Sequence, residues 1–149
     1  MIKSLMGVFI TMMCLNAAFA VDEIMPMEHH DMNVTDARTS LHLSERMKQH
    51  QLADMRSHLE AINDIVGLMA ENRFAEASKM AHEKLGLSPE MQRMCNMLGN
   101  EKATAMGLAF HRSGDELGDA LQTKDVSRSL SSLHNTMQYC VECHATFRQ

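Results

Sequence analysis

The stretch Cys140-Val141-Glu142-Cys143-His144 lies close to the C-terminus of the 149-residue sequence. Two cysteines at this spacing lie about one turn apart on the same face of a helix. A histidine directly after the second cysteine completes the C-x-x-C-H signature by which c-type haem is attached. The stretch therefore predicts thioether bonds from Cys140 and Cys143 to one covalent haem, with His144 as the proximal iron ligand.

Other meanings of a C-x-x-C pair agree less well with the rest of the sequence. A structural zinc site needs a second pair of ligands, and Cys95 is the one other cysteine beyond residue 20. A thioredoxin-like redox pair needs a preceding strand, and the sequence has no strand pattern. An incidental buried pair, or a disulfide between Cys140 and Cys143, is the alternative left open.

Residues 1–20 have the pattern of a secretory signal peptide. Lys3 gives a positive start, an apolar run too short to span a bilayer follows, and Ala18-Phe19-Ala20 is a typical cleavage site. We therefore expect export to the periplasm of a Gram-negative bacterium, which agrees with covalent haem attachment outside the cytoplasm. The rest of the sequence shows no membrane-spanning segment.

Residues 21–40 are predicted to form a flexible, polar leader. Its imidazole and thioether groups suggest copper binding as an alternative. The groups concerned are Met25, Met27, His29, His30 and Met32. The formal net charge of the whole sequence is −5, which argues against nucleic-acid binding and suits a soluble protein that meets a basic redox partner.

Residues 41–149 are predicted to form an all-α domain, an antiparallel four-helix bundle without a sheet. Apolar residues recur at steps of three and four, and Gly and Pro are few. The first helix is expected from Ser40 or Ser44 to about Ala70. Its predicted apolar stripe is Leu43, Met47, Met55, Leu59, Ile62, Val66 and Met69.

Shorter helical pieces are expected between Phe74 and Leu98, a third long helix from about Glu101, and the last helix from about Asp125. The predicted inward face of the last helix is Leu130, Leu133, Met137, Cys140, His144 and Phe147. A haem bound on that face would lie inside the bundle, where helical proteins usually place cofactors.

The run from Cys140 to Arg148 resembles the ending of the class II c-type cytochromes, the cytochrome c′ and cytochrome c-556 family, which reads C-x-x-C-H-x-x-[Tyr/Phe]-Arg. The resemblance covers about residues 40–148 and is strongest at this ending. It implies one haem c in an antiparallel four-helix bundle, with Phe147 and Arg148 on the proximal side of the haem. Many members form homodimers through their first two long helices, so a homodimer is one expectation.

On the distal side of the haem, the resemblance places Leu52 where cytochrome c′ proteins have an apolar residue over an open iron. Met55, one turn on, lies at or near the position where other members offer a thioether ligand. His58 is a third candidate for the sixth ligand. Lys48 departs from the family, which has an arginine at about this position.

We therefore expect a periplasmic one-electron carrier rather than an enzyme, because no acid–base or nucleophile–base pattern is evident. The alternative is a five-coordinate haem protein that binds nitric oxide or carbon monoxide under Leu52. A third hypothesis is a copper-handling protein that uses the leader. His58 and His111 fall on or near apolar helix faces, and Cys95 is expected to be a buried core residue. The remaining helical histidines are expected at the surface: His42, His50, His82 and His134.

Overall fold

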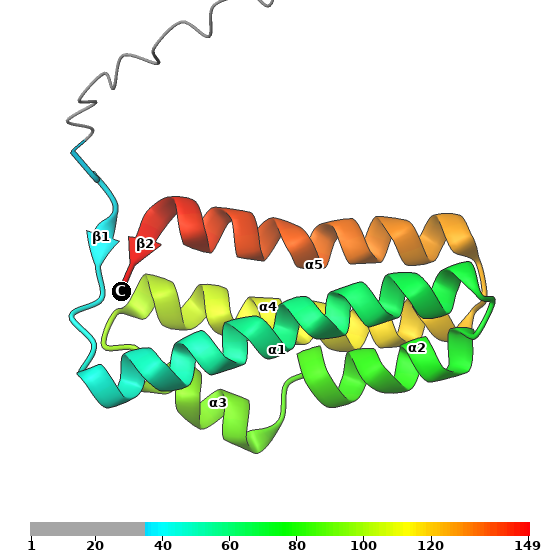
Figure 1. Ribbon diagram of the computed structural model, residues 1–149, viewed down its shortest axis with the longest axis horizontal. Helices are drawn as coiled ribbons and strands as arrows, with labels where there is room; N and C mark the ends of the chain where they lie inside the picture. The colour runs from blue at the N-terminus through cyan, green and yellow to red at the C-terminus, as the bar shows by residue number, and fades with distance from the viewer. Residues whose placement is uncertain (1–34) are drawn as a thin grey trace, which may run out of the picture. The chain divides into compact units, whose positions relative to one another are not determined.

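The computed structural model describes residues 35–149, which are almost entirely helical (Figure 1). The helices are α1 (Glu45–Ala70), α2 (Phe74–Met80), the π-helical turn η1 (Ala81–Leu85), α3 (Pro89–Asn96), α4 (Glu101–Gln122) and α5 (Val126–Thr146). The strands β1 (Thr39–Ser40) and β2 (Phe147–Arg148) have two residues each. The predicted all-α class is confirmed, whereas the expectation of no sheet is wrong, because this strand pair forms a two-stranded parallel sheet. The predicted signal peptide and the copper-binding part of the leader lie outside the described residues.

The helices begin where capping chemistry predicts. In each case a side-chain oxygen accepts a hydrogen bond from the backbone N–H three residues on, which satisfies one of the free donors of the first turn. These N-caps are Ser44, Ser88, Asn100 and Asp125. Pro89 is the first residue of α3, where its missing N–H costs nothing.

Helix α4 is the central element of the domain. It packs extensively against α5 and also contacts α2, η1 and α3, whereas α1 packs mainly against α2 and η1. Its residues Leu117 and Leu121 are fully buried, and they share one apolar core with Ile65 of α1, Leu85 of η1 and Leu133 of α5. Residues Asp36–Gln149 form one compact unit, so the last residues of the predicted leader belong to this domain. None of the helices in residues 35–149 is long and apolar enough to span a membrane.

Two glycines of α4 allow η1 to approach it closely. Gly114 faces the backbone of Leu85, and Gly118 faces the imidazole of His82. A Cβ at position 114 would overlap the backbone of Leu85, so the packing needs glycine there, whereas a Cβ at position 118 would displace the imidazole of His82. The Nδ1 atom of His82 lies 3.2 Å from Oδ1 of Asp115, which further joins η1 to α4. His82 is therefore partly buried in an interhelical contact rather than free on the surface.

The predicted apolar stripe of α1 is wrong at two positions. Leu59 is 69% exposed and Val66 is 48% exposed, whereas Ile62, Ile65 and Met69 face the core. The steps of three and four describe a band wider than the surface that α1 buries. The residues on one edge of that band therefore stay in solvent.

The predicted inward face of α5 is also rotated. Leu130, Met137 and His144 are exposed, and the fully buried positions are Ser129 and Thr136. The Thr136 hydroxyl lies 3.1 Å from the carbonyl oxygen of Ser113 in α4, so this polar group is buried with a hydrogen-bond partner. Small hydrogen-bonded residues thus occupy the α4–α5 contact where apolar residues were expected.

The C-terminal end of α5 differs from the prediction as well. The helix ends at Thr146, and Phe147 has extended backbone angles. Arg148 therefore lies in β2 and not one helical turn beyond His144. Strand β2 pairs in parallel with β1, and the N–H of Leu41 donates to the carbonyl oxygen of Arg148 at 3.0 Å.

We expect a strong contrast between leucine truncations inside and outside the core. Leu117→Ala should lower the free energy of unfolding by about 2–5 kcal/mol, because it leaves a cavity in a fully buried site. Leu59→Ala should change it by about 0.5 kcal/mol or less, because that side chain is exposed. Urea unfolding of the two variants prepared without cofactor would measure both values. A similar loss in both variants would contradict the packing described here.

Candidate functional site

The three chemical groups of the C-x-x-C-H motif lie in the last two turns of α5. Cys140 and Cys143 are partly buried free thiols, while His144 is exposed. Burial raises the pKa of both thiols above its ordinary value. Each thiol is therefore held in its protonated, uncharged form at neutral pH. Two unpaired thiols and an accessible imidazole are thus grouped at one end of the domain.

Each cysteine is anchored in a different apolar cluster. Cys140 packs against the main core, which includes Leu133, about two turns earlier on α5. Cys143 packs against a second cluster formed by Leu98, Ala103 and Phe147, together with Leu41 and Met106. Phe147 was predicted to shape this side of the site, and it is buried beside Cys143. The backbone that carries the motif is therefore held by apolar contacts on both sides.

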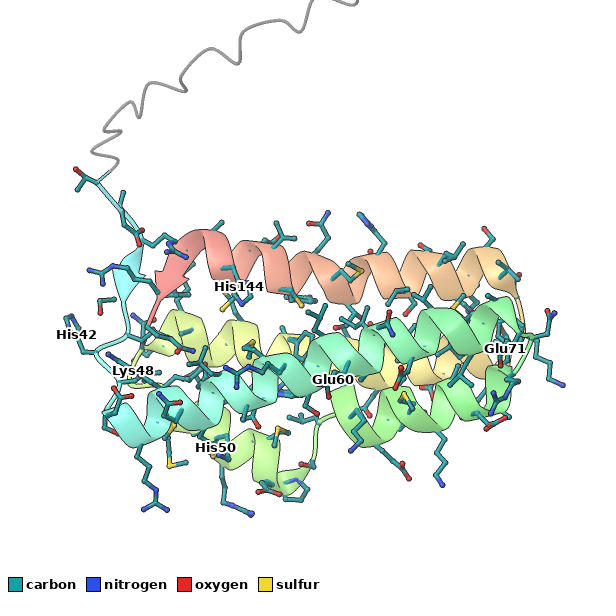
Figure 2. All side chains as sticks on the ribbon, in the orientation of Figure 1. His42, Lys48, His50, Glu60, Glu71 and His144 are labelled. Atoms are coloured by element: carbon teal, nitrogen blue, oxygen red, sulfur yellow. The ribbon has the colours of Figure 1, made fainter. Side chains whose placement is uncertain are left out.

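His144 belongs to a strip of exposed residues along α5. Leu130, Met137 and His144 recur at intervals of seven residues, which is close to two helical turns, so they lie in line along the helix. Leu130 is 51% exposed and Met137 is 44% exposed. In the view of Figure 2, His144 lies on the side of α5 toward α1. The imidazole thus continues a strip of apolar side chains that are open to solvent.

Helix α1 carries a matching strip. Leu52, Leu59 and Val66 also recur at intervals of seven residues, and all three are exposed. Met55 lies one turn after Leu52, on the edge between this strip and the core, and is partly buried. Single exposed apolar residues are ordinary, but an aligned series on two helices indicates a surface that another group covers.

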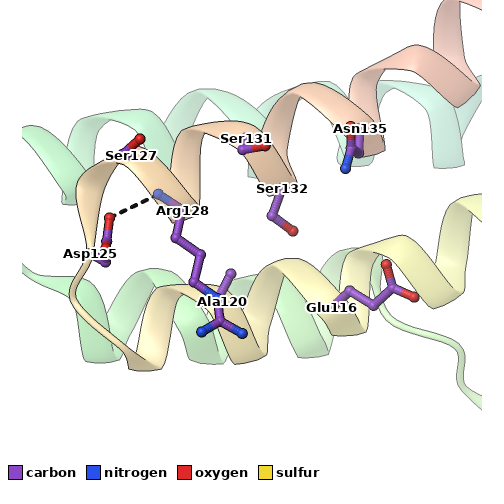
Figure 3. Close-up of a pocket in the computed structure, with 8 residues that line it drawn as sticks. All are labelled: Glu116, Ala120, Asp125, Ser127, Arg128, Ser131, Ser132 and Asn135. Atoms are coloured by element: carbon purple, nitrogen blue, oxygen red, sulfur yellow. Dashed lines mark hydrogen bonds between the residues drawn. The ribbon is translucent and has the colours of Figure 1, made fainter.

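The opposite flank of α5 is polar. Glu116 and Ala120 of α4 and a series of polar residues at the start of α5 line a shallow hollow of about 480 Å³ between the two helices (Figure 3). The residues of α5 and its N-cap are Asp125, Ser127, Arg128, Ser131, Ser132 and Asn135. None of these is a predicted site residue. The hydrophobic strip of α5 therefore lies on the other flank of the helix.

Each strip lies beside residues of the same apolar core. Both α1 and α5 contribute to the core that α4 closes, Ile62 and Ile65 from α1 and Leu133 from α5. The flank of α1 opposite its strip is covered by its contacts with α2 and η1. The strip on α1 and the strip on α5 therefore each lie on a flank that the contacts between helices leave uncovered. We call the residues Leu52, Leu59, Val66, Leu130 and Met137 the apolar face.

The third distal candidate, His58, has a different environment. It is only 8% exposed, and its ring centroid lies 4.9 Å from that of Phe110 and 5.4 Å from that of His111 on α4. Burial lowers the pKa of His58 to about 4, with a smaller contribution from His111. Burial also lowers the pKa of His111, whose Nδ1 donates to the carbonyl oxygen of Leu85 at 2.8 Å. Both imidazoles are therefore neutral at pH 7.

Two residues next to the site had no signal in the sequence. Arg38 donates from Nη1 to the carbonyl oxygen of His144 at 3.2 Å, and Asp36 pairs with the same guanidinium. This contact joins residues 106 positions apart, so no local pattern could have predicted it. Arg148 was expected on the proximal side of the haem. Its Nε lies 3.8 Å from Asp36, and Arg38 occupies the helix end instead.

Other expectations about single residues are confirmed. Cys95 is buried, and His42, His50 and His134 are exposed. Lys48, where the resemblance implied an arginine, is partly buried on the first turn of α1.

The residues at this site could hold a haem. Within residues 35–149, no group of three or more His, Cys, Asp or Glu side chains could hold a metal ion by itself. A haem supplies four iron ligands from its own porphyrin and requires an axial donor from the protein. Two free thiols, an accessible imidazole and an uncovered apolar face meet those requirements.

No protein-family model matches the chain, and the searches of curated proteins and of solved structures found no significant match. The interpretation of the site therefore depends on its own residues.

The buried histidines predict how stability changes with pH. The pKa of His58 in the folded state, about 4, lies below its ordinary value of 6.5, so protons bind preferentially to the unfolded chain. The free energy of unfolding should therefore fall as the pH drops from 6.5 to 4, by about 3 kcal/mol for this residue. His58→Leu should remove most of that loss, whereas His134→Leu, which changes an exposed histidine, should keep it. Parallel stability curves for the His58→Leu variant and the unmodified chain, prepared without cofactor and unfolded in urea, would contradict the assignment.

Proposed function

We propose that this chain is a class II c-type cytochrome: a periplasmic, non-enzymatic carrier of one electron with a single covalent haem c in an antiparallel four-helix bundle. The observation that carries the proposal is the position of His144. It follows Cys143 in a C-x-x-C-H run and stands in line with the exposed Leu130 and Met137 of α5. Motif chemistry and an uncovered apolar surface therefore point to the same place.

The apolar face supports the proposal energetically. Removing apolar surface from water is favourable by about 25 cal/mol per Å². Leu52, Leu59 and Met137 leave such surface in water on α1 and α5. A porphyrin is a flat apolar group of the size that spans two helices, so it would cover side chains on both. The same covering would exclude water from the iron.

Each residue of the motif then has a distinct role. Cys140 and Cys143 would hold the porphyrin edge, and their apolar clusters would fix that edge against α5. His144 would supply the axial nitrogen, and Phe147 would keep solvent from the proximal side. When bound, the haem supplies the ferric–ferrous couple, whose potential depends on axial ligation, burial and nearby charge. A negatively charged surface suits docking to a basic redox partner.

We propose Met55 as the sixth iron ligand. It is partly buried and lies on α1 between the exposed strip and the core, and its unbranched side chain can adjust to reach a metal. His58 is less suitable, because its ring packs against Phe110 and His111 on the α4 side. Leu52 favours the second candidate function. It lies in the exposed strip, and if it covered an open iron the site would bind nitric oxide or carbon monoxide.

Haem attachment should depend on two of the three thiols in the described residues. The chain without substitutions should be expressed with a c-type maturation system and extracted with acid. Its mass should then exceed that of the polypeptide by one haem. Cys140→Ser and Cys143→Ser should each reduce or abolish covalent attachment, while Cys95→Ser should leave it intact. Two alkylatable thiols at 140 and 143 in the matured protein would refute the proposed function.

The axial ligand should depend on one of the two exposed histidines of α5. His144→Ala should leave the haem attached through its thioethers but abolish the native visible spectrum, because the proximal nitrogen is lost. His134→Ala removes a comparable exposed imidazole from the same helix and should have no effect. A native spectrum that survives the loss of His144 would exclude it as the ligand.

The sixth ligand separates electron transfer from gas binding. If Met55 ligates the iron, the ferrous protein should be low-spin and bind carbon monoxide slowly, and Met55→Ala should make it high-spin and fast. His58→Ala should not do so. A ferrous protein that is high-spin and binds carbon monoxide rapidly before any substitution would favour the open site under Leu52.

A further inference from the structure

A segment from the start of the described chain lies beside the last turn of α5, which carries the end of the C-x-x-C-H motif. Residues Asp36–Leu41, which we call the strap, run beside the end of α5 through the pairing of β1 with β2. Thr39 lies opposite Phe147 and Ser40 opposite Arg148 in this parallel pair. Leu41 then adds its side chain to the cluster that contains Phe147 and Cys143. The strap is therefore attached to the turn by backbone bonds and by apolar contact.

Arg38 connects the strap directly to the proposed iron ligand. Its Nη1 donates to the carbonyl oxygen of His144 at 3.2 Å. Its Nε and Nη2 donate to the two carboxylate oxygens of Asp36 at 2.9 and 2.8 Å. One guanidinium thus holds a carboxylate with two nitrogens and the helix end with the third. Such a fork has fixed geometry, which a lysine cannot reproduce.

The carbonyl group that Arg38 contacts needs a partner. The last four carbonyl groups of a helix have no N–H of the helix to accept from. For His144 that N–H would come from Arg148, which lies in β2 and not in α5. Arg38 supplies the missing donor, and its positive charge also suits the negative end of the helix dipole. The Asp36 carboxylate stays ionised, because its bonds to Arg38 lower its pKa to about 2.

We propose that Arg38 is a positioning residue for His144. By holding the carbonyl group of His144, Arg38 fixes the last turn of α5 and with it the direction of the imidazole toward the haem iron; the inference rests on the function proposed above. Asp36 acts through Arg38, because it holds the guanidinium in place. A surface ion pair alone contributes little to stability, so the effect should appear in the axial ligand rather than in unfolding.

Three variants separate positioning from a simple effect of charge. Arg38→Gln removes the fork and one positive charge, Arg38→Lys keeps the charge without the fork, and Asp36→Asn removes one negative charge and loosens the fork. Arg73→Gln is the matched control. Arg73 pairs in the same bidentate manner with Glu76, and also with Glu71, but it lies before α2, and Figure 2 shows Glu71 at the opposite end of the domain from His144.

The experiment measures the reduction potential and the ferric electron paramagnetic resonance spectrum of each haem-loaded protein, with attachment checked first by mass. Positioning predicts that all three variants change the g values and shift the potential in the same direction, while Arg73→Gln does neither. Amide exchange of Leu41, whose N–H bonds to Arg148, should also accelerate by about tenfold in the Arg38 variants.

Two results would overturn the inference while leaving the proposed function intact. Opposite potential shifts for Arg38→Gln and Asp36→Asn, with Arg38→Lys like the unmodified protein, would show an effect of charge alone. Spectra and potentials unchanged in all three variants would show that the strap does not act on His144. An unmodified chain that attaches no haem would instead refute the proposed function, and the inference with it.

Discussion

Helices α1 and α5 each expose an aligned strip of apolar side chains to water. The proposed function depends on this exposure. A helix gains stability by turning its apolar side toward its neighbours, and α1 and α5 do so only in part. Leu59 and Met137 point away from the core although each helix has buried residues beside them. An aligned pair of such strips favours a further apolar group between the helices. The thiols and the imidazole at the end of α5 identify the group that would fit.

The packing of α4 leaves that surface open. Small and hydrogen-bonded residues make the α4–α5 contact, with Thr136 bonded to the backbone of α4, so the larger apolar side chains of α5 are turned aside. The absence of side chains at Gly114 and Gly118 allows η1 to pack closely against the other flank of α4. Helix α4 therefore has close neighbours on both flanks, while α1 and α5 each keep one flank uncovered.

Local chemistry in the sequence predicted much of this fold. The helix starts at Ser44 and Asp125 and the attachment motif follow from residues a few positions apart. The rotation of α5 could not be predicted in this way. Ser129 and Thr136 are polar, so they are expected at the surface unless a partner helix provides their hydrogen bonds. The contact of Arg38 with His144 depends on β1 meeting β2, which only the folded chain brings together. The choice of the sixth ligand on α1 likewise depends on the position of the proposed haem, which the amino-acid sequence does not specify.

The central claim is that a haem covers the part of the apolar face nearest His144, and the oxidation of two methionines tests it most directly. Met137 lies in the α5 strip and is 44% exposed, while Met97, which directly follows α3, is 51% exposed and does not belong to the apolar face. Hydroxyl-radical footprinting with mass spectrometry would compare their oxidation rates in chains with and without attached haem. The account predicts that haem attachment slows the oxidation of Met137 and leaves that of Met97 unchanged. Equal reactivity of Met137 in both forms would contradict it.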